Sequence, residues 1–210
     1  MNLSYSLNDI LFLDIETVPQ QQEWNALSKE IQELFEKKTQ YQRKDEIPVE
    51  EFYERGGIWA EFGKIICISV GYFVIQDNEK QFRVRSFFGD DEFKILSDFK
   101  VLLDKHFSKK EHVLCAHNGK EFDFPYLCRR MVVNGIPLPY ALDTSGKKPW
   151  EVNHLDTMQM WKFGDYKHYT SLDLLASIFN IESSKQGIDG SEVGDVYYKE
   201  NDIDKIARYC

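Results

Sequence analysis

Two acidic residues, Asp14 and Glu16, stand two positions apart near the end of an apolar run of the chain. The stretch Ile10–Glu16 has five apolar residues in seven, which is typical of a strand buried on both faces of a sheet. Because side chains alternate along a strand, both carboxylates are expected on the same side. Buried paired carboxylates repel each other and lose hydration, at several kcal/mol per charge unless a cation or strong donors compensate. Oxygen ligands of this kind suit Mg²⁺ or Mn²⁺, so the pair is a candidate for half of a divalent-metal site.

The acid pair needs a second half from elsewhere in the chain. Pro19 ends the strand and leaves the two acids near its carboxyl end, where open sheets present their ligands. The alternative, a strand that runs out into solvent with two hydrated acids, stays open on the residue pattern alone. Asp123 is the first candidate for the second half, although a carboxylate in the first turn of a helix is also favoured by the helix dipole.

The segment after Pro19 predicts an insertion of helices before the next strand. Apolar residues at three- and four-residue steps predict an amphipathic helix over about 22–38. Its apolar stripe is Trp24, Leu27, Ile31, Leu34 and Phe35. A polar loop over Thr39–Glu46 follows, and Pro48 opens a short helix that Gly56-Gly57 ends.

The remaining elements predict a mixed-sheet α/β domain. Two strands over 64–75 and 81–88, joined by a turn at Asp77-Asn78, form a hairpin. Asp90 or Asp91 caps the next helix, whose stripe is Phe93, Leu96, Phe99, Leu102, Leu103 and Phe107. A short buried strand over 112–116 leads into a helix that ends near Asn134-Gly135. The last expected elements are a strand over 152–156, a helix from Thr170 or Ser171 to Phe179, and helices over 192–199 and 203–210.

Composition limits the class of protein. The 210 residues, 42% apolar and 14% aromatic, suit one globular domain spanning 1–210. A net charge of −9 argues against a general nucleic-acid coat protein but permits an enzyme that holds one strand end at an acidic metal site. Four dispersed cysteines without a C-x-x-C pair indicate a reducing cytoplasmic compartment. No signal peptide is recognisable, and no run reaches the ~18 apolar residues that span a bilayer, so we expect no membrane association.

The two acidic stretches together resemble the DEDD superfamily of 3′→5′ exonucleases. The closest similarity is to the proofreading exonuclease domain of B-family DNA polymerases and its stand-alone relatives. The first motif of that family, D-x-E, matches Asp14-Ile15-Glu16, with Thr17 as the polymerase-like continuation. The second motif, an Asn, two or three residues, an aromatic residue and an Asp, matches Asn118 to Phe122-Asp123. The resemblance covers essentially the whole chain and implies the ribonuclease H-like exonuclease fold.

The third motif of the tyrosine subgroup is Y-x-x-x-D. Tyr209 resembles its tyrosine, which places the fourth Asp three residues beyond Cys210, so the 210-residue chain is expected to be truncated just before that ligand. A literal Y-x-x-x-D also occurs at Tyr198 and Asp202. We interpret Asp202 instead as the cap of the last helix and favour Tyr209.

The resemblance implies hydrolysis of the terminal phosphodiester at a 3′ end, with release of nucleoside 5′-monophosphates. Two divalent ions, Mg²⁺ or Mn²⁺, would be held by Asp14, Glu16 and Asp123. Tyr209 would orient or deprotonate the attacking water. The residues expected to contact the terminal nucleotide are Thr17, Asn118 and Phe122. A single-stranded 3′ end is the expected partner, with DNA favoured over RNA.

Two other functions stay open at this point. One is a nucleic-acid-binding module that kept the fold but lost catalysis, and the other is a different metal-dependent phosphohydrolase that acts on a small nucleotide. Asp156 is either a strand-end turn acid or an acid that supports the site from behind. Basic residues at 129–130, 147–148, Lys162 and Lys185 are candidates for phosphate contacts, although scattered basic pairs more often mark a solvated face. The sequence indicates nothing about protein partners or oligomeric state.

Overall fold

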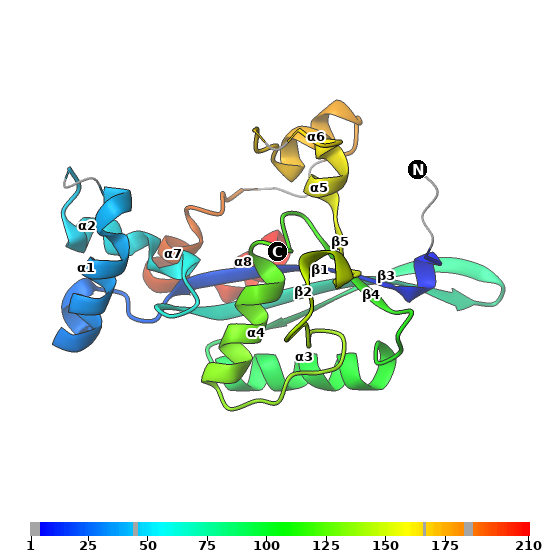
Figure 1. Ribbon diagram of the computed structural model, residues 1–210, viewed down its shortest axis with the longest axis horizontal. Helices are drawn as coiled ribbons and strands as arrows, with labels where there is room; N and C mark the ends of the chain where they lie inside the picture. Colours follow the sequence, from blue (N-terminus) through cyan, green and yellow to red (C-terminus); the bar gives the residue numbers. More distant parts are fainter. Residues whose placement is uncertain (1–4, 44–45, 166, 183–186) are drawn as a thin grey trace.

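A five-stranded mixed sheet forms the centre of the protein (Figure 1). The computed structural model describes residues 5–43, 46–165, 167–182 and 187–210, so Lys185 lies outside the described residues. The strands, in the order β3-β2-β1-β4-β5, are β3 Glu79–Phe88, β2 Gly63–Gln76, β1 Ile10–Pro19, β4 Val113–Ala116 and β5 Leu155–Asp156. β1 is antiparallel to β2 and parallel to β4, while β2–β3 is antiparallel and β4–β5 parallel. This confirms the predicted α/β class and agrees with a ribonuclease H-like exonuclease fold.

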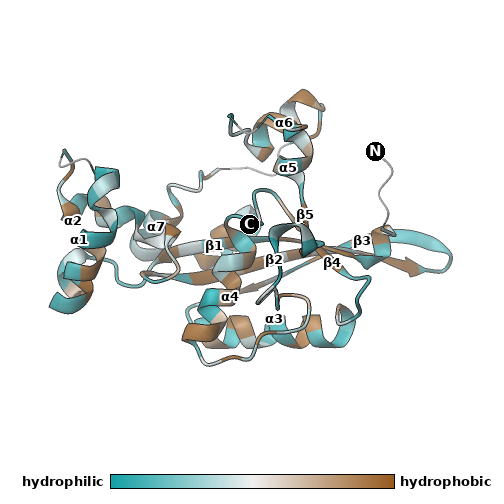
Figure 2. Ribbon diagram, viewed as in Figure 1, coloured by the Kyte–Doolittle hydropathy of each residue, from teal (hydrophilic) through white to brown (hydrophobic). Residues whose placement is uncertain are grey.

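The main core lies between the sheet and two helices, α3 Glu92–His106 and α4 Asp123–Val133, which lie below the sheet in Figure 1. Apolar residues gather along the strands and on α3 (Figure 2). Because side chains alternate along β1, its odd residues enter this core, whose β1 members are Leu11, Leu13 and Ile15. Asp91 caps α3 and the stripe from Leu96 to Phe107 is buried, but Phe93 is 55% exposed, which corrects its predicted place in the stripe.

The opposite face of the sheet is covered in part by the carboxyl-terminal elements. These are α7 Val193–Asp195, a π-helical turn Val196–Glu200 and α8 Ile203–Tyr209. Their apolar residues Val193, Val196 and Ile206 form a second cluster with strand residues that include Val18 and Ile66. α8 thereby ends beside the middle of β1, on the face to which Asp14 and Glu16 belong.

The insertion between β1 and β2 forms its own aromatic cluster. It contains a 3-10 turn Trp24–Ala26, α1 Lys29–Arg43, α2 Val49–Phe52 and a 3-10 helix Tyr53–Ile58. The predicted helix over about 22–38 was therefore wrong at both ends, since α1 begins at Lys29 and continues through part of the expected loop. Two buried polar side chains explain the extension, because Arg43 donates to the Thr39 hydroxyl and Thr39 donates to a carbonyl one turn earlier. Leu34, predicted in the apolar stripe, is 50% exposed.

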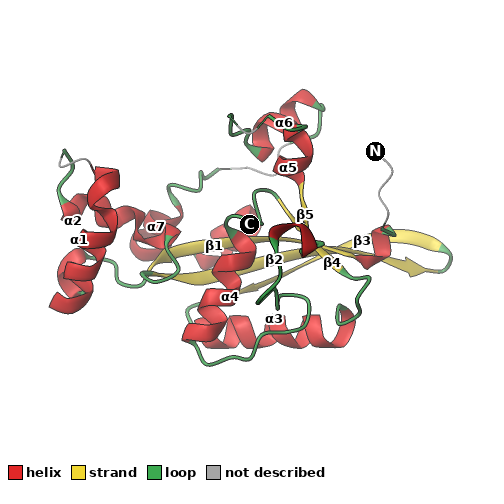
Figure 3. Ribbon diagram, in the orientation of Figure 1, coloured by secondary structure: helices red, strands yellow, loops and turns green. Residues whose placement is uncertain are grey.

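A helical arm stands on the other side of the sheet from α3 and α4 (Figure 3). It consists of α5 Thr157–Lys162 and α6 Leu172–Ile178, preceded by a 3-10 turn Pro149–Glu151. Ser171 caps α6 as predicted, whereas α5 was not predicted and the strand expected over 152–156 is reduced to the two residues of β5. Within the described ranges, no helix has the length and apolar character needed to cross a bilayer.

Candidate active site

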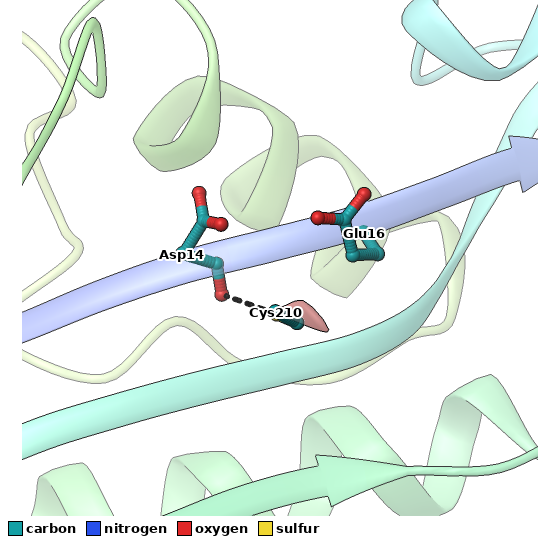
Figure 4. A group of neighbouring side chains, drawn as sticks. All are labelled: Asp14, Glu16 and Cys210. Carbon is teal, nitrogen blue, oxygen red and sulfur yellow. Dashed lines mark hydrogen bonds between the residues drawn. The ribbon is translucent and has the colours of Figure 1, made fainter. Parts of the chain in front are cut away.

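The carboxylates of Asp14 and Glu16 lie side by side above β1 (Figure 4). One ligand atom from each, together with the Cys210 Sγ, falls within 4.8 Å of the others. The Cys210 thiol also donates to the Asp14 carbonyl oxygen at 3.6 Å, which holds the end of α8 against β1. Asp14 is exposed and Glu16 half-buried. The structure therefore brings together two hard oxygen ligands at an accessible position of the sheet.

One edge of β1 is open beside these acids. β4 pairs with β1 from Ile10 to Phe12, and beyond Phe12 no strand among the described residues pairs with β1 on that side. A register shift with β2 between Glu16 and Thr17 bends the strand at the same point. The amino-terminal end of α4 approaches this open edge, where the backbone of Ile15 lies near enough to the Asp123 carboxyl to lower its pKa slightly against the effects that raise it.

Asp123 is the buried member of the site, with only 3% of its surface exposed. Burial raises the pKa of its carboxyl well above the usual range, and the negative charge of Asp14 raises it further. Its Oδ1 atom is buried and has no hydrogen-bond partner among the described residues. A carboxylate oxygen that is buried, faces a like charge and lacks a donor is a position that a bound cation would stabilise.

The loop that carries Asp123 is held by Asp156. One Asp156 oxygen accepts the backbone N–H of Asn118 at 3.0 Å and the other accepts that of Lys120 at 3.1 Å. The same carboxylate also caps α5 through the N–H groups of Met158 and Gln159. Asp156 therefore does both things that the sequence leaves open: it is a turn acid that caps α5, and it supports the loop of Asp123 from behind. The two donors in the loop hold it where Asn118 lies in the left-handed region at φ 62°.

His117 connects the same loop to the arm. Its Nδ1 lies 2.9 Å from the Thr157 hydroxyl on α5, and its Nε2 lies 2.8 Å from the Thr170 carbonyl just before α6. Gly119 is needed in the loop because a Cβ there would collide with the Ala116 side chain. Sequence reasoning missed His117, since its partners are 40 and 53 residues away and no spacing motif marks them.

The predicted nucleotide-contacting residues occupy different surroundings. Thr17 donates its hydroxyl proton to the Gly57 carbonyl at 2.8 Å, which pins the insertion to the end of β1. Phe122 is half-buried and packs against Tyr126 at a centroid distance of 5.3 Å, so part of its ring belongs to the core. The Asn118 Oδ1 atom is buried without a hydrogen-bond partner among the described residues.

Tyr209 lies at the end of α8, half-buried beside the acid pair. Burial raises the pKa of its hydroxyl, and the negative charges of Glu16, Asp189 and Asp14 add to the rise, so the hydroxyl stays protonated and can donate. Tyr198, the alternative tyrosine, instead donates to the Pro19 carbonyl at 2.5 Å. Asp202 caps α8 by accepting the Lys205 N–H at 2.9 Å, as predicted.

Comparison with known proteins finds a family model that matches most of the chain. A family model described as a predicted 3′-5′ exonuclease related to the exonuclease domain of PolB matches residues 58–210, about three quarters of the chain. The matched part contains Asn118, Asp123 and Tyr209, whereas Asp14 and Glu16 precede it. No curated protein matches the chain.

Proposed function

Because the chain belongs to the family of predicted 3′-5′ exonucleases related to the exonuclease domain of PolB, we propose that it hydrolyses the terminal phosphodiester of single-stranded DNA and releases nucleoside 5′-monophosphates. Two observations carry this proposal: the close Asp14–Glu16 pair, and the buried Asp123, which lies outside that close group but near enough for the Asp14 charge to raise its pKa. A close pair of carboxylates with a third, buried one facing it suits a site for divalent ions and for an anionic substrate that the ions attract.

Asp14, Glu16 and Asp123 would hold Mg²⁺ or Mn²⁺, with two ions expected. Bound ions of this kind activate a water for attack and stabilise the departing 3′ oxygen. The exposed Asp14 and half-buried Glu16 would face the entering substrate, while Asp123 is buried at the start of α4. A buried ligand beside two accessible ones would hold a bound ion in the same position while substrate enters and product leaves.

The chain's own polar groups would orient the substrate. The Tyr209 hydroxyl stays protonated, so it donates a hydrogen bond to the attacking water or to a phosphate oxygen and thereby orients the water. Thr17 gives its proton to Gly57 and so offers its oxygen lone pairs to a 3′ hydroxyl. Asn118 and the exposed part of the Phe122 ring are proposed to contact the terminal nucleotide.

The surroundings in which this activity operates are part of the proposal. All four cysteines are free thiols, which supports a reducing cytoplasmic compartment. DNA is favoured over RNA because of the D-I-E-T sequence over 14–17. A single strand is favoured over a duplex, since only a splayed end reaches carboxylates set on a strand.

Digestion of a 5′-labelled single-stranded DNA oligonucleotide tests the proposal. We expect a single-nucleotide ladder with Mn²⁺ or Mg²⁺, none in EDTA, and none from Asp14→Asn. The matched control is Asp98→Asn, which removes an exposed carboxylate that pairs with Lys94 on α3, below the sheet. A ladder in EDTA would contradict the metal site, and a ladder on RNA alone would contradict the DNA preference. Tight oligonucleotide binding without any cleavage would support the inactive binding module instead.

A binding measurement tests the metal site separately from catalysis. Mn²⁺ at one hundred times its Kd is expected to raise the free energy of unfolding by about 2.7 kcal/mol if it binds only the folded protein. The shift should be lost in Asp14→Asn and kept in Asp98→Asn. An equal shift in all three proteins would place the bound ion elsewhere.

A further inference from the structure

A second polar cavity lies at the other end of the parallel strands. Its volume is about 180 Å³, and its lining includes Lys110, His112, Tyr140, Lys147, Asn153 and His154. His112 directly precedes β4, and residues 152–154 directly precede β5. The acid pair and the loop of Asp123 lie toward the carboxyl ends of β1 and β4, which run parallel. The cavity is therefore a separate site at the opposite end of the same strands.

The lining of this cavity is cationic in a chain whose net charge is −9. It includes two lysines, Lys110 and Lys147, and one acid, Glu151, whose Oε2 accepts the backbone N–H of Lys148 at 2.8 Å. The charge of the nearby lysines also acts on His154, a residue of the lining. The pKa of His154 is lowered to about 4, first by burial and then by the charges of Lys120 and Lys147.

Two exposed aromatic rings each lie beside a lysine: Tyr140 belongs to the lining, and Trp150 directly precedes the lining residue Glu151 in the chain. The ammonium group of Lys147 lies 6.0 Å from the centroid of Tyr140, and that of Lys148 lies 5.4 Å from the centroid of Trp150. Tyr140 is 55% and Trp150 76% exposed. Lysines interleaved with exposed aromatic faces are the features with which proteins hold single-stranded nucleic acid, since the lysines bind phosphates and the rings stack on bases.

We propose that this cavity, the Lys110–Lys147 pocket, binds a phosphate group of the nucleic-acid strand whose 3′ end lies at the acid pair. A volume of about 180 Å³ has room for roughly six waters at ~30 Å³ each, which suits a phosphate group and leaves the bases to the exposed rings of Tyr140 and Trp150. The donors for the phosphate are the two lysine ammonium groups and the Asn153 amide. The identity of the strand rests on the proposed function, whereas the phosphate site rests on the pocket alone.

The length of β4 sets how many nucleotides of the bound nucleic acid lie between the acid pair and the pocket. From His112 to His117 there are five residue steps of about 3.3 Å, or roughly 17 Å. A stacked strand advances about 3.4 Å per nucleotide, so about five nucleotides separate the pocket from the scissile bond. A 12-mer would therefore fill both sites, while a dinucleotide would reach only the acid pair.

Binding of a labelled single-stranded DNA 12-mer in EDTA, measured by fluorescence anisotropy over a salt series, tests the proposal without catalysis. Lys110→Gln/Lys147→Gln is expected to weaken binding about tenfold at low salt. It should also reduce the slope of log K against log salt by about 0.7, because one phosphate of the single strand is no longer neutralised. The matched control, Lys29→Gln/Lys37→Gln on α1, removes the same charge and should leave the slope within error. Equal losses in both double variants would mean a general charge effect and would overturn the pocket.

Two further arms separate the sources of the phosphate and the two proposals. Inorganic phosphate that perturbs the His112 imidazole and Trp150 indole NMR signals, with no change in 12-mer affinity in the pocket variant, would show a free-anion site and overturn strand binding. In digestion with Mn²⁺, the pocket variant should raise KM for the 12-mer and not for a dinucleotide. If no form of the protein cleaves DNA, the proposed function fails, yet the anisotropy result still decides the pocket.

Discussion

Two carboxylates of this protein stand at equivalent places and meet opposite surroundings. Glu92 is the first residue of α3 and Asp123 the first residue of α4, and their exposed fractions are 9% and 3%. Glu92 is fully compensated, because Arg130 binds both of its oxygens at 2.8 and 2.6 Å and Asn134 donates a further bond. Asp123 faces Asp14 and keeps one oxygen without a donor among the described residues.

The difference shows how one chemical group serves structure in one place and chemistry in another. The Ile65 N–H also donates to Glu92 at 2.7 Å, so that site joins β2, α3 and α4 and has no capacity left for a ligand. The Asp123 site is left uncompensated at the open edge of β1, and uncompensated buried charge is retained where a ligand completes it. Burial alone therefore does not mark a functional acid; the missing partner does.

We expect the largest effect from neutralising Asp123. The effect should be on the rate of DNA cleavage and not on the free energy of unfolding. For Asp123→Asn we expect the rate of DNA cleavage to fall by about 10³-fold or more, since a metal ligand supplies several kcal/mol of charge stabilisation. In EDTA the free energy of unfolding should not fall, because the raised pKa means that the folded state already disfavours the ionised form. Urea unfolding and oligonucleotide digestion measure the two effects.

The neighbouring Glu121→Gln is the matched control for Asp123→Asn, because Glu121 is exposed and lies in the same loop. It should leave both quantities near their original values. A loss of stability in Asp123→Asn comparable to its loss of activity would assign Asp123 to the fold and abolish the contrast with Glu92.

Removing the partner of Glu92 should give the reverse pattern. Arg130→Met leaves a buried carboxylate without its bidentate partner, which is expected to lower the free energy of unfolding by about 3–5 kcal/mol. The cleavage rate per folded molecule should change little, since Arg130 also donates to the Ala60 carbonyl and lies in the core rather than at the acid pair. Arg129→Met, the exposed neighbour, is the control and should cost under 1 kcal/mol.

The surroundings of Arg130 also correct its prediction as a candidate phosphate contact. Both ends of its guanidinium are occupied by protein oxygens, so a DNA-binding defect in Arg130→Met that exceeded its stability defect would go against the structure.

His154 is a third buried titratable group to compare with Glu92 and Asp123. It needs no compensating charge because it stays neutral. Its pKa falls from 6.5 to about 4, so the folded protein resists protonation that the unfolded chain accepts. Stability from this group is present above pH 6.5 and is lost as the pH falls toward 4, by about 3 kcal/mol in total. We expect urea unfolding of His154→Gln to show a weaker loss between pH 6.5 and 4 than the parent. Identical pH dependence in both proteins would mean that other groups carry the acid sensitivity.

The sequence predicted those parts of the site that depend on local pattern. Strand alternation placed Asp14 and Glu16 on one side, and the helix start after Phe122 placed Asp123 in a first turn. What it could not predict depends on contacts between distant segments: the Glu92–Arg130 pair spans 38 residues, and His117 reaches α5 and α6 across 40 and 53. The sequence also failed to predict that α1 continues to Arg43. Thr39 and Arg43 are polar and look like loop residues in the sequence, but in the fold both are buried and hydrogen-bond to each other.

The smallest expected effect concerns the tyrosine beside the acid pair. Tyr209→Phe removes one hydroxyl, which should lower kcat about tenfold to thirtyfold and leave KM nearly unchanged, since the ring and the end of α8 remain. Tyr198→Phe is the matched control. Its hydroxyl bonds to Pro19, so it should lose about 1 kcal/mol of stability and keep kcat.

The pH profile then distinguishes two roles for Tyr209. Because its pKa is raised by burial and by Glu16, a Tyr209 that orients water as a donor predicts parallel kcat profiles for the parent and Tyr209→Phe up to pH 9. A Tyr209 that removes a proton as the phenolate predicts that the parent profile rises with pH while that of Tyr209→Phe stays flat. Parallel profiles would mean that Tyr209 keeps its hydroxyl proton throughout this pH range. Burial and the nearby acids would then make Tyr209 a hydrogen-bond donor. Converging or diverging profiles would mean that a bound cation lowers the pKa of Tyr209 enough for its hydroxyl to lose the proton in this range.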